Sequence, residues 1–150
     1  MSTLITGGTG FIGAEIARML VESDDDVHVA HRSGNLGRLE GIADQVELHQ
    51  FDLSVPGSAT SLLAEVAPER LFHFGAILTA PGEDDPQALL QANAAGFIEL
   101  IEAARLAGTE KMIFASSIGT YGRDTGGGVI NDLTLQRPRS VYGVTKVFGE

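Results

Sequence analysis

Short apolar runs alternate with longer segments of helical spacing along the whole chain. The runs have the length of strands, and most are apolar on consecutive residues, which is typical of strands buried on both faces of a parallel sheet. They cover residues 3–6, 27–30, 46–50, 71–74 and 111–116. This alternation predicts an α/β fold, a doubly wound parallel sheet of about five strands with helices on both faces.

Three segments between these runs carry apolar residues at the spacing of a helix. The first follows the first strand, and its apolar face comprises Ile12, Ile16, Met19 and Leu20. The second covers residues 58–66. The third begins after Pro86 and ends near Gly108, with a stripe of Leu89, Phe97, Leu100, Ile101 and Ala104. A glycine run at residues 126–128 predicts a mobile loop rather than a domain boundary, so we expect one domain.

Composition and charge narrow the classes of partner. The 150 residues include no cysteine, which excludes disulfides and thiolate metal sites. A net charge of −10 argues against non-specific binding to nucleic acid or to an anionic membrane. No apolar run approaches the length of a membrane span, and the first residues do not resemble a signal peptide. We therefore expect a cytoplasmic protein whose partner is neither nucleic acid nor a membrane.

A glycine-rich turn, "TGGTGFIG" at residues 6–13, connects the first strand to the first helix. Glycines at 8, 10 and 13 fit the spacing of the dinucleotide-binding (Rossmann) fingerprint. This chemistry requires glycine because the backbone turns tightly and approaches a pyrophosphate, which the N-terminus of the helix then binds. The alternative is a glycine-rich turn that binds nothing.

The end of the second strand bears on the choice between NAD and NADP. A carboxylate at this position normally holds the ribose 2′-hydroxyl of NAD. Here the strand is followed by His31, Arg32 and Ser33, and Arg32 is suited to pair with a 2′-phosphate. We therefore expect NADP to be favoured, with NAD as the alternative if Arg32 is only a solvated loop residue.

Tyr142 and Lys146 are four residues apart, so on a helix they share a face. A tyrosine pKa near 10 falls to 7 only with about 4 kcal/mol of differential stabilisation, of the kind that a nearby ammonium supplies. Tyr142 would then take the proton of a substrate hydroxyl as a hydride leaves the same carbon. The alternative is an exposed pair on a solvated helix face.

These motifs resemble the extended short-chain dehydrogenase/reductases, the epimerase/dehydratase group. The resemblance rests on Gly7, Gly10 and Gly13 in TGxxGxxG spacing and on Tyr142 and Lys146 in YxxxK spacing. It implies that Ser117, Tyr142 and Lys146 are catalytic. The motifs and the resemblance together assign the cofactor site to Gly7, Gly10, Phe11, Ile12, Gly13, His31, Arg32, Ser33, Asp52, Leu53, Gly75, Ala76, Asn93, Ser116, Tyr142 and Lys146.

Within this group, "LTLQRPRSVYGVTKVFGE" and "GAILTA" look most like the L-threonine 3-dehydrogenase branch. The resemblance implies a small-molecule substrate and NAD(P)-dependent transfer of a hydride from a secondary alcohol, such as the hydroxy amino acid L-threonine, by a Ser-Tyr-Lys mechanism. There are two alternatives. One is a nucleotide-sugar epimerase or dehydratase that uses the same Tyr–Lys pair, and the other is a non-catalytic dinucleotide-binding module. The resemblance also implies that residues 1–150 are an incomplete NAD(P)-binding domain, which is inactive without a substrate-binding lobe. It implies further that the whole enzyme dimerises through the helix that carries Tyr142 and Lys146.

The remaining polar residues of the predicted core have structural interpretations. His28, His49 and His73 are expected to be satisfied core residues, and Asn93 to pin the end of a strand near the cofactor. No group of histidine and acidic residues has the spacing of metal ligands along the chain, so we expect no metal.

Overall fold

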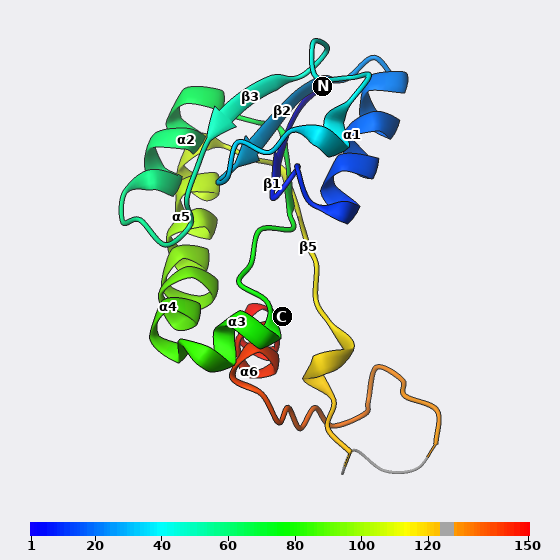
Figure 1. Ribbon diagram of the computed structural model, residues 1–150, viewed down its shortest axis with the longest axis vertical. Helices are drawn as coiled ribbons and strands as arrows, with labels where there is room; N and C mark the ends of the chain where they lie inside the picture. Colours follow the sequence, from blue (N-terminus) through cyan, green and yellow to red (C-terminus); the bar gives the residue numbers. More distant parts are fainter. Residues whose placement is uncertain (124–127) are drawn as a thin grey trace.

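Five parallel strands form one sheet in the computed structural model, which describes residues 1–123 and 128–150. The strand order is β3-β2-β1-β4-β5 (Figure 1). The strands are β1 (Ser2–Thr6), β2 (Asp26–His31), β3 (Glu47–Gln50), β4 (Arg70–His73) and β5 (Lys111–Phe114). The predicted doubly wound parallel sheet is confirmed. From the central strand β1 the chain proceeds through β2 to the edge strand β3, and it then crosses back to β4 on the other side of β1.

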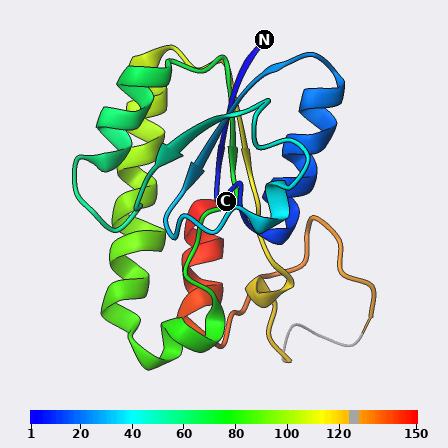
Figure 2. The same cartoon turned by 45° about the horizontal axis from the view of Figure 1, so that its top comes forward.

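Helices cover both faces of the sheet, as Figure 2 shows with α1 on one side and the pair α2 and α5 on the other. The helical elements are α1 (Phe11–Glu22), η1 (Gly37–Leu39), α2 (Ser58–Val66), α3 (Thr79–Asp84), α4 (Pro86–Leu90), η2 (Gln91–Gly96), α5 (Phe97–Ala107), η3 (Ile118–Thr120) and α6 (Val141–Gly149). The second predicted helix has the bounds of α2. None of the described helices is long and apolar enough to span a membrane.

The two faces of the sheet bury separate apolar cores. Alternate residues of β1 supply them, with Leu4 packing toward α2 and α5 and Ile5 packing toward α1. On α1, the residues fully buried against the sheet are the small Ala14 and Ala17, whereas Met19 is 56% exposed. The predicted apolar face of α1 was therefore wrong in part. The helix lies close to the sheet, and only small side chains fit at the contact.

The third predicted helix is interrupted by a different helical form. Residues from Pro86 to Ala107 are helical throughout, but η2 is a π-helix between α4 and α5. At its end, a side chain on Gly96 would put a Cβ 2.1 Å from the carbonyl oxygen of Leu53, so only glycine allows this approach. Ile101 of the predicted stripe is largely exposed, because the buried face of α5 is centred on Leu100 and Ala104.

The segment between β4 and α4 contains a helix that the sequence pattern did not reveal. Glu83 of α3 accepts a hydrogen bond from the backbone N–H of Val141 at 2.8 Å and so caps the N-terminus of α6. Of the predicted glycine loop, Gly126 and Gly127 lie outside the described residues, and Gly128 has a positive φ of 154°.

Candidate functional site

A cleft of about 560 Å³ opens at the carboxyl ends of β1, β2 and β4. In a doubly wound sheet this is where the connections diverge and ligands bind. Every predicted site residue lines the cleft except Asn93 and Ser117. Residues that were not predicted also line it, namely Thr9, Ala30, Phe51, Phe74, Ile77, Leu78, Ala92 and Ala115.

The glycine-rich turn forms one wall of this cleft. Gly7, at φ +70°, donates its N–H to the carbonyl oxygen of Ala30 at 3.1 Å, which ties the turn to the end of β2. A Cβ on Gly13 would lie 2.5 Å from the carbonyl oxygen of Gly7, whereas one on Gly10 would meet only that oxygen, at 3.0 Å. Gly10 caps α1, and no acidic residue occupies the first turn of the helix. The free N–H groups of this turn therefore offer a site for an anion.

The loops after β2 and β3 form the opposite wall. His31 Nδ1 accepts a hydrogen bond from Gly34 N–H at 3.2 Å, so this side chain helps to shape the loop that carries Arg32. Asp52 Oδ1 accepts from the N–H of Ser54 at 2.9 Å and from its hydroxyl at 2.7 Å. These bonds lower the pKa of Asp52, and the positive charge of Arg32 lowers it further. The cleft thus has an ionised carboxylate and a guanidinium at this end.

Asn93 lies behind the cleft rather than in it. Its Oδ1 accepts a hydrogen bond from the N–H of Ile77, and its Nδ2 donates to the carbonyl oxygen of Ile77, both at 2.8 Å. Nδ2 also lies 3.5 Å from Thr145 Oγ1 of α6. The buried amide therefore pins the segment after β4, as expected from the sequence, and links it to α6.

Tyr142 and Lys146 reach the cleft from α6, whose first turn is capped by Ser140 Oγ, an acceptor for Gly143 N–H at 3.0 Å. Lys146 is only 5% exposed. Its Nζ donates to the carbonyl oxygen of Ala115 at 2.9 Å and lies 4.6 Å from the centre of the Phe114 ring and 5.6 Å from that of Tyr142. Burial lowers the pKa of the Lys146 ammonium.

The two serines after β5 have different contacts. Ser117 Oγ accepts from Gly119 N–H at 3.1 Å and so caps η3. This short helix packs on α6, since a Cβ on Gly143 would lie 2.3 Å from the carbonyl oxygen of Gly119, and Gly119 lies beside the Tyr142 ring. Ser116 lines the cleft but donates its hydroxyl to the Glu150 carboxylate.

His73 supports the site from within the sheet. Its Nδ1 lies 2.6 Å from Thr6 Oγ1, and its ring stacks on Phe97 and Phe114. Burial, followed by the charge of Lys146, lowers its pKa from 6.5 to about 3, so the ring is neutral. The expectation of a satisfied core histidine is confirmed. Phe114, which lies between His73 and Lys146, was not singled out because an apolar residue in a strand carries no chemical signal.

Sequence and structure comparisons agree on one group of proteins. The profile of the NAD dependent epimerase/dehydratase family matches residues 3–150. The UDP-glucose 4-epimerase of Mycolicibacterium smegmatis is 37% identical over 158 residues, covering 100% of this chain and 49% of that protein.

Two solved structures show the same fold over nearly the whole chain. The Thermus thermophilus UDP-glucose 4-epimerase complex with NAD has a TM-score of 0.87 and 28% identity, covering 99% of this chain and 48% of that one. The L-threonine dehydrogenase of Clostridium difficile has a TM-score of 0.85 and 26% identity, with 99% and 46% coverage. The chain spans about half the length of the curated relatives it matches.

Proposed function

Because the chain belongs to the NAD dependent epimerase/dehydratase family, we propose that its cleft binds a nicotinamide adenine dinucleotide for hydride transfer. The residues fit such a group. The cleft volume of about 560 Å³ lies within the range of cofactor sites. Glycine at position 10 leaves free the space that a side chain would occupy there. The first turn of α1 would hold the pyrophosphate, and Asp52 would accept a hydrogen bond from the adenine.

The adenosine ribose would lie near Arg32 and Ser33. No carboxylate follows β2, and the Asp24–Asp26 run lies at the other end of that strand. We therefore propose that Arg32 pairs with a 2′-phosphate and that NADP is preferred to NAD. The relative from Thermus thermophilus was solved with NAD, so this preference would distinguish the present chain from that protein.

The observation that carries the catalytic proposal is the buried Lys146 ammonium beside Tyr142 in the same cleft as the glycine turn. When bound, the nicotinamide ring supplies the acceptor for a hydride from a secondary alcohol. Tyr142 Oη takes the proton of that hydroxyl, and the charge of Lys146 favours the phenolate. Ser117, held by η3 against α6, is the proposed hydrogen-bond partner of the substrate oxygen.

Two substrate classes have separate support. The M. smegmatis relative favours a nucleotide sugar, whose hydroxyl would be oxidised and then reduced from the other face. The stretch around Tyr142 and the C. difficile structure favour a hydroxy amino acid such as L-threonine. The whole protein would act on one of these and function in the cytoplasm. A non-catalytic dinucleotide-binding module is the remaining alternative.

Cofactor binding and turnover test these proposals separately. Titration of the 150-residue chain with NADH and NADPH, followed by nucleotide fluorescence, should give saturable binding of both. The whole protein should then convert either UDP-glucose or L-threonine, and Tyr142→Phe should remove turnover while retaining cofactor binding. Absence of binding to both nucleotides would refute the cofactor site. Binding without turnover of either substrate would favour the module.

A further inference from the structure

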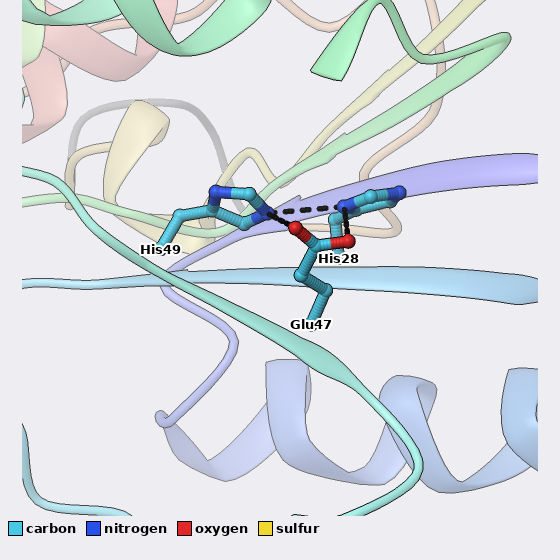
Figure 3. A group of neighbouring side chains, drawn as sticks. All are labelled: His28, Glu47 and His49. Atoms are coloured by element: carbon cyan, nitrogen blue, oxygen red, sulfur yellow. Dashed lines mark hydrogen bonds and ion pairs between the residues drawn. The ribbon is translucent and has the colours of Figure 1, made fainter. Parts of the chain in front are cut away.

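Two histidines and a glutamate meet on the sheet, as Figure 3 shows, and none of the three lines the cleft. His28 lies on β2, and Glu47 and His49 lie on the edge strand β3. The β2–β3 register pairs His28 with Glu47 and Ala30 with His49, so all three side chains share one face. They are 21 residues apart at most, and only the parallel register brings them together.

The distances within this group match those of a metal site. His28 Nδ1 lies 3.0 Å from His49 Nε2 and 3.5 Å from Glu47 Oε2, and His49 Nε2 lies 3.9 Å from Glu47 Oε1. Ligands held by a tetrahedral Zn²⁺ at about 2.0–2.2 Å lie about 3.3 Å from one another. Modest side-chain rotation therefore places all three ligand atoms around one ion without movement of the strands.

The outer nitrogens of both rings face carboxylates. His28 Nε2 lies 3.4 Å from Asp26 Oδ2, and His49 Nδ1 lies 3.4 Å from Glu65 Oε1 of α2. Each carboxylate favours a proton on the nitrogen that it faces, which is the arrangement found behind histidines that bind metals. The inner nitrogens, His28 Nδ1 and His49 Nε2, then present lone pairs to each other at 3.0 Å, next to the Glu47 carboxylate. A cation between the rings, or an inward N–H on one of them, satisfies this contact.

We propose that His28 Nδ1, His49 Nε2 and the Glu47 carboxylate bind one divalent transition-metal ion of the Zn²⁺ class. Imidazole with carboxylate suits zinc rather than Mg²⁺ or Ca²⁺, which prefer oxygen ligands alone. The side chains of His28 and His49 are 10% and 7% exposed, whereas that of Glu47 is 63% exposed. The ion would therefore enter from the open edge of the sheet and keep water at its remaining position.

Bound there, the ion joins β2 to β3 on the face covered by α2. Strand β3 has only four residues and one neighbouring strand, so a cross-link at this place stabilises the edge of the fold. The cleft-lining residues Phe51 and Asp52 directly follow this strand. The site is nevertheless separate from the proposed cofactor, because none of its three ligands lines the cleft.

Zinc titration of the tag-free 150-residue chain, in competition with a chromophoric chelator, tests the proposal. We expect one Zn²⁺ per chain, a higher melting temperature with Zn²⁺, and the visible absorption of tetrahedral Co²⁺ when cobalt replaces zinc. Glu47→Gln should weaken zinc binding at least tenfold, and His49→Gln should abolish it. Because Glu47 is exposed, its variant should fold and should bind NADH as the wild type does.

Two control variants separate this site from ordinary surface binding. Glu110→Gln removes an exposed carboxylate beside the opposite edge strand, and His31→Gln removes an imidazole outside the cluster. Both should bind zinc as the wild type does. Absence of zinc binding at micromolar concentration would overturn the proposal and would indicate an inward N–H on one of the rings. Equal zinc affinity in wild type, Glu47→Gln and His49→Gln would also overturn it.

Discussion

The amide of Asn93 forms a two-bond ring with the backbone N–H and C=O of Ile77. It does so from the π-helical segment η2, whose wider turn is common at functional sites. Ile77 belongs to the segment that lines the cleft after β4. The position of that wall therefore depends on one side chain in an unusual helical turn.

Replacing Asn93 with leucine should destabilise the fold and weaken cofactor binding. Two backbone groups of Ile77 would lose their partners in a partly buried place, which costs about 3 kcal/mol. Urea unfolding and NADH titration measure the two effects. Unchanged stability in Asn93→Leu would contradict the pinning role.

Gly10 and Gly13 should respond differently to an added side chain. Gly10 has extended backbone angles, and its Cβ would meet a single atom, the Gly7 carbonyl oxygen at 3.0 Å, so Gly10→Val should fold and lose dinucleotide binding. Gly13→Ala should lose about 1–3 kcal/mol of stability, because its Cβ would press on the Gly7 and Gly8 backbone. Circular dichroism with nucleotide titration distinguishes them. A folded Gly10→Val with normal affinity would mean that the turn binds no phosphate.

Arg32→Ala should reduce affinity for NADPH more than for NADH. A guanidinium paired with a 2′-phosphate contributes about 1.5–3 kcal/mol, which corresponds to roughly a tenfold to hundredfold loss for NADPH. Fluorescence titration with both reduced nucleotides measures the ratio. Arg38→Ala, in η1 beyond the cleft lining, serves as a control for general charge effects. The NADP preference would be refuted if the wild type bound NADPH and NADH with equal affinity and Arg32→Ala changed neither affinity.

The neutral, buried His73 should make the fold less stable in acid. Its pKa is near 3 in the folded chain and 6.5 ordinarily, so only the unfolded chain binds a proton between these values. The contribution of His73 to the free energy of unfolding is greatest above pH 6.5 and falls by about 1.4 kcal/mol per pH unit below that value. In His73→Gln that loss is absent, so its stability deficit relative to wild type should shrink from pH 7 to pH 5. A constant deficit in urea unfolding at both pH values would argue against a neutral His73.

We propose that a second copy of the whole protein covers the outer face of α6, where Val144 and Phe148 are about half exposed. These residues are one helical turn apart and form an apolar strip on the helix that also carries Tyr142 and Lys146. Phe148→Glu should convert a dimer to a monomer in light scattering after gel filtration. Leu133→Glu, in an exposed loop, should leave the dimer intact. A monomeric wild type would exclude this interface.

The sequence predicted most of what forms the cleft and little of what holds it in place. The strands, the turn at Gly10 and the Tyr142–Lys146 helix follow from local patterns of apolar residues and glycine. The cap that Glu83 supplies to α6 and the contact of Gly96 with Leu53 depend on segments that are distant in sequence. Such contacts leave no periodic signal in a single chain.

The neighbouring positions of His28, Glu47 and His49 and the buried face of α1 were not predicted, for a related reason. His28 and Glu47 belong to different strands, and only the register between β2 and β3 makes them neighbours. On α1, hydrophobicity alone favoured Met19 over Ala17, but the distance to the sheet selected the smaller residue. The NADP preference and the catalytic roles stay predictions, because neither fold nor family decides them.

The burial of Lys146 also determines how the protein can be attached to surfaces or dyes. The sequence has two lysines, and the other, Lys111, is exposed at the start of β5. Amine-reactive esters need an accessible amine, so within this chain they should modify Lys111 while leaving the buried Lys146 intact. Conjugates made with this ordinary chemistry would keep an unmodified cleft, without any engineered cysteine.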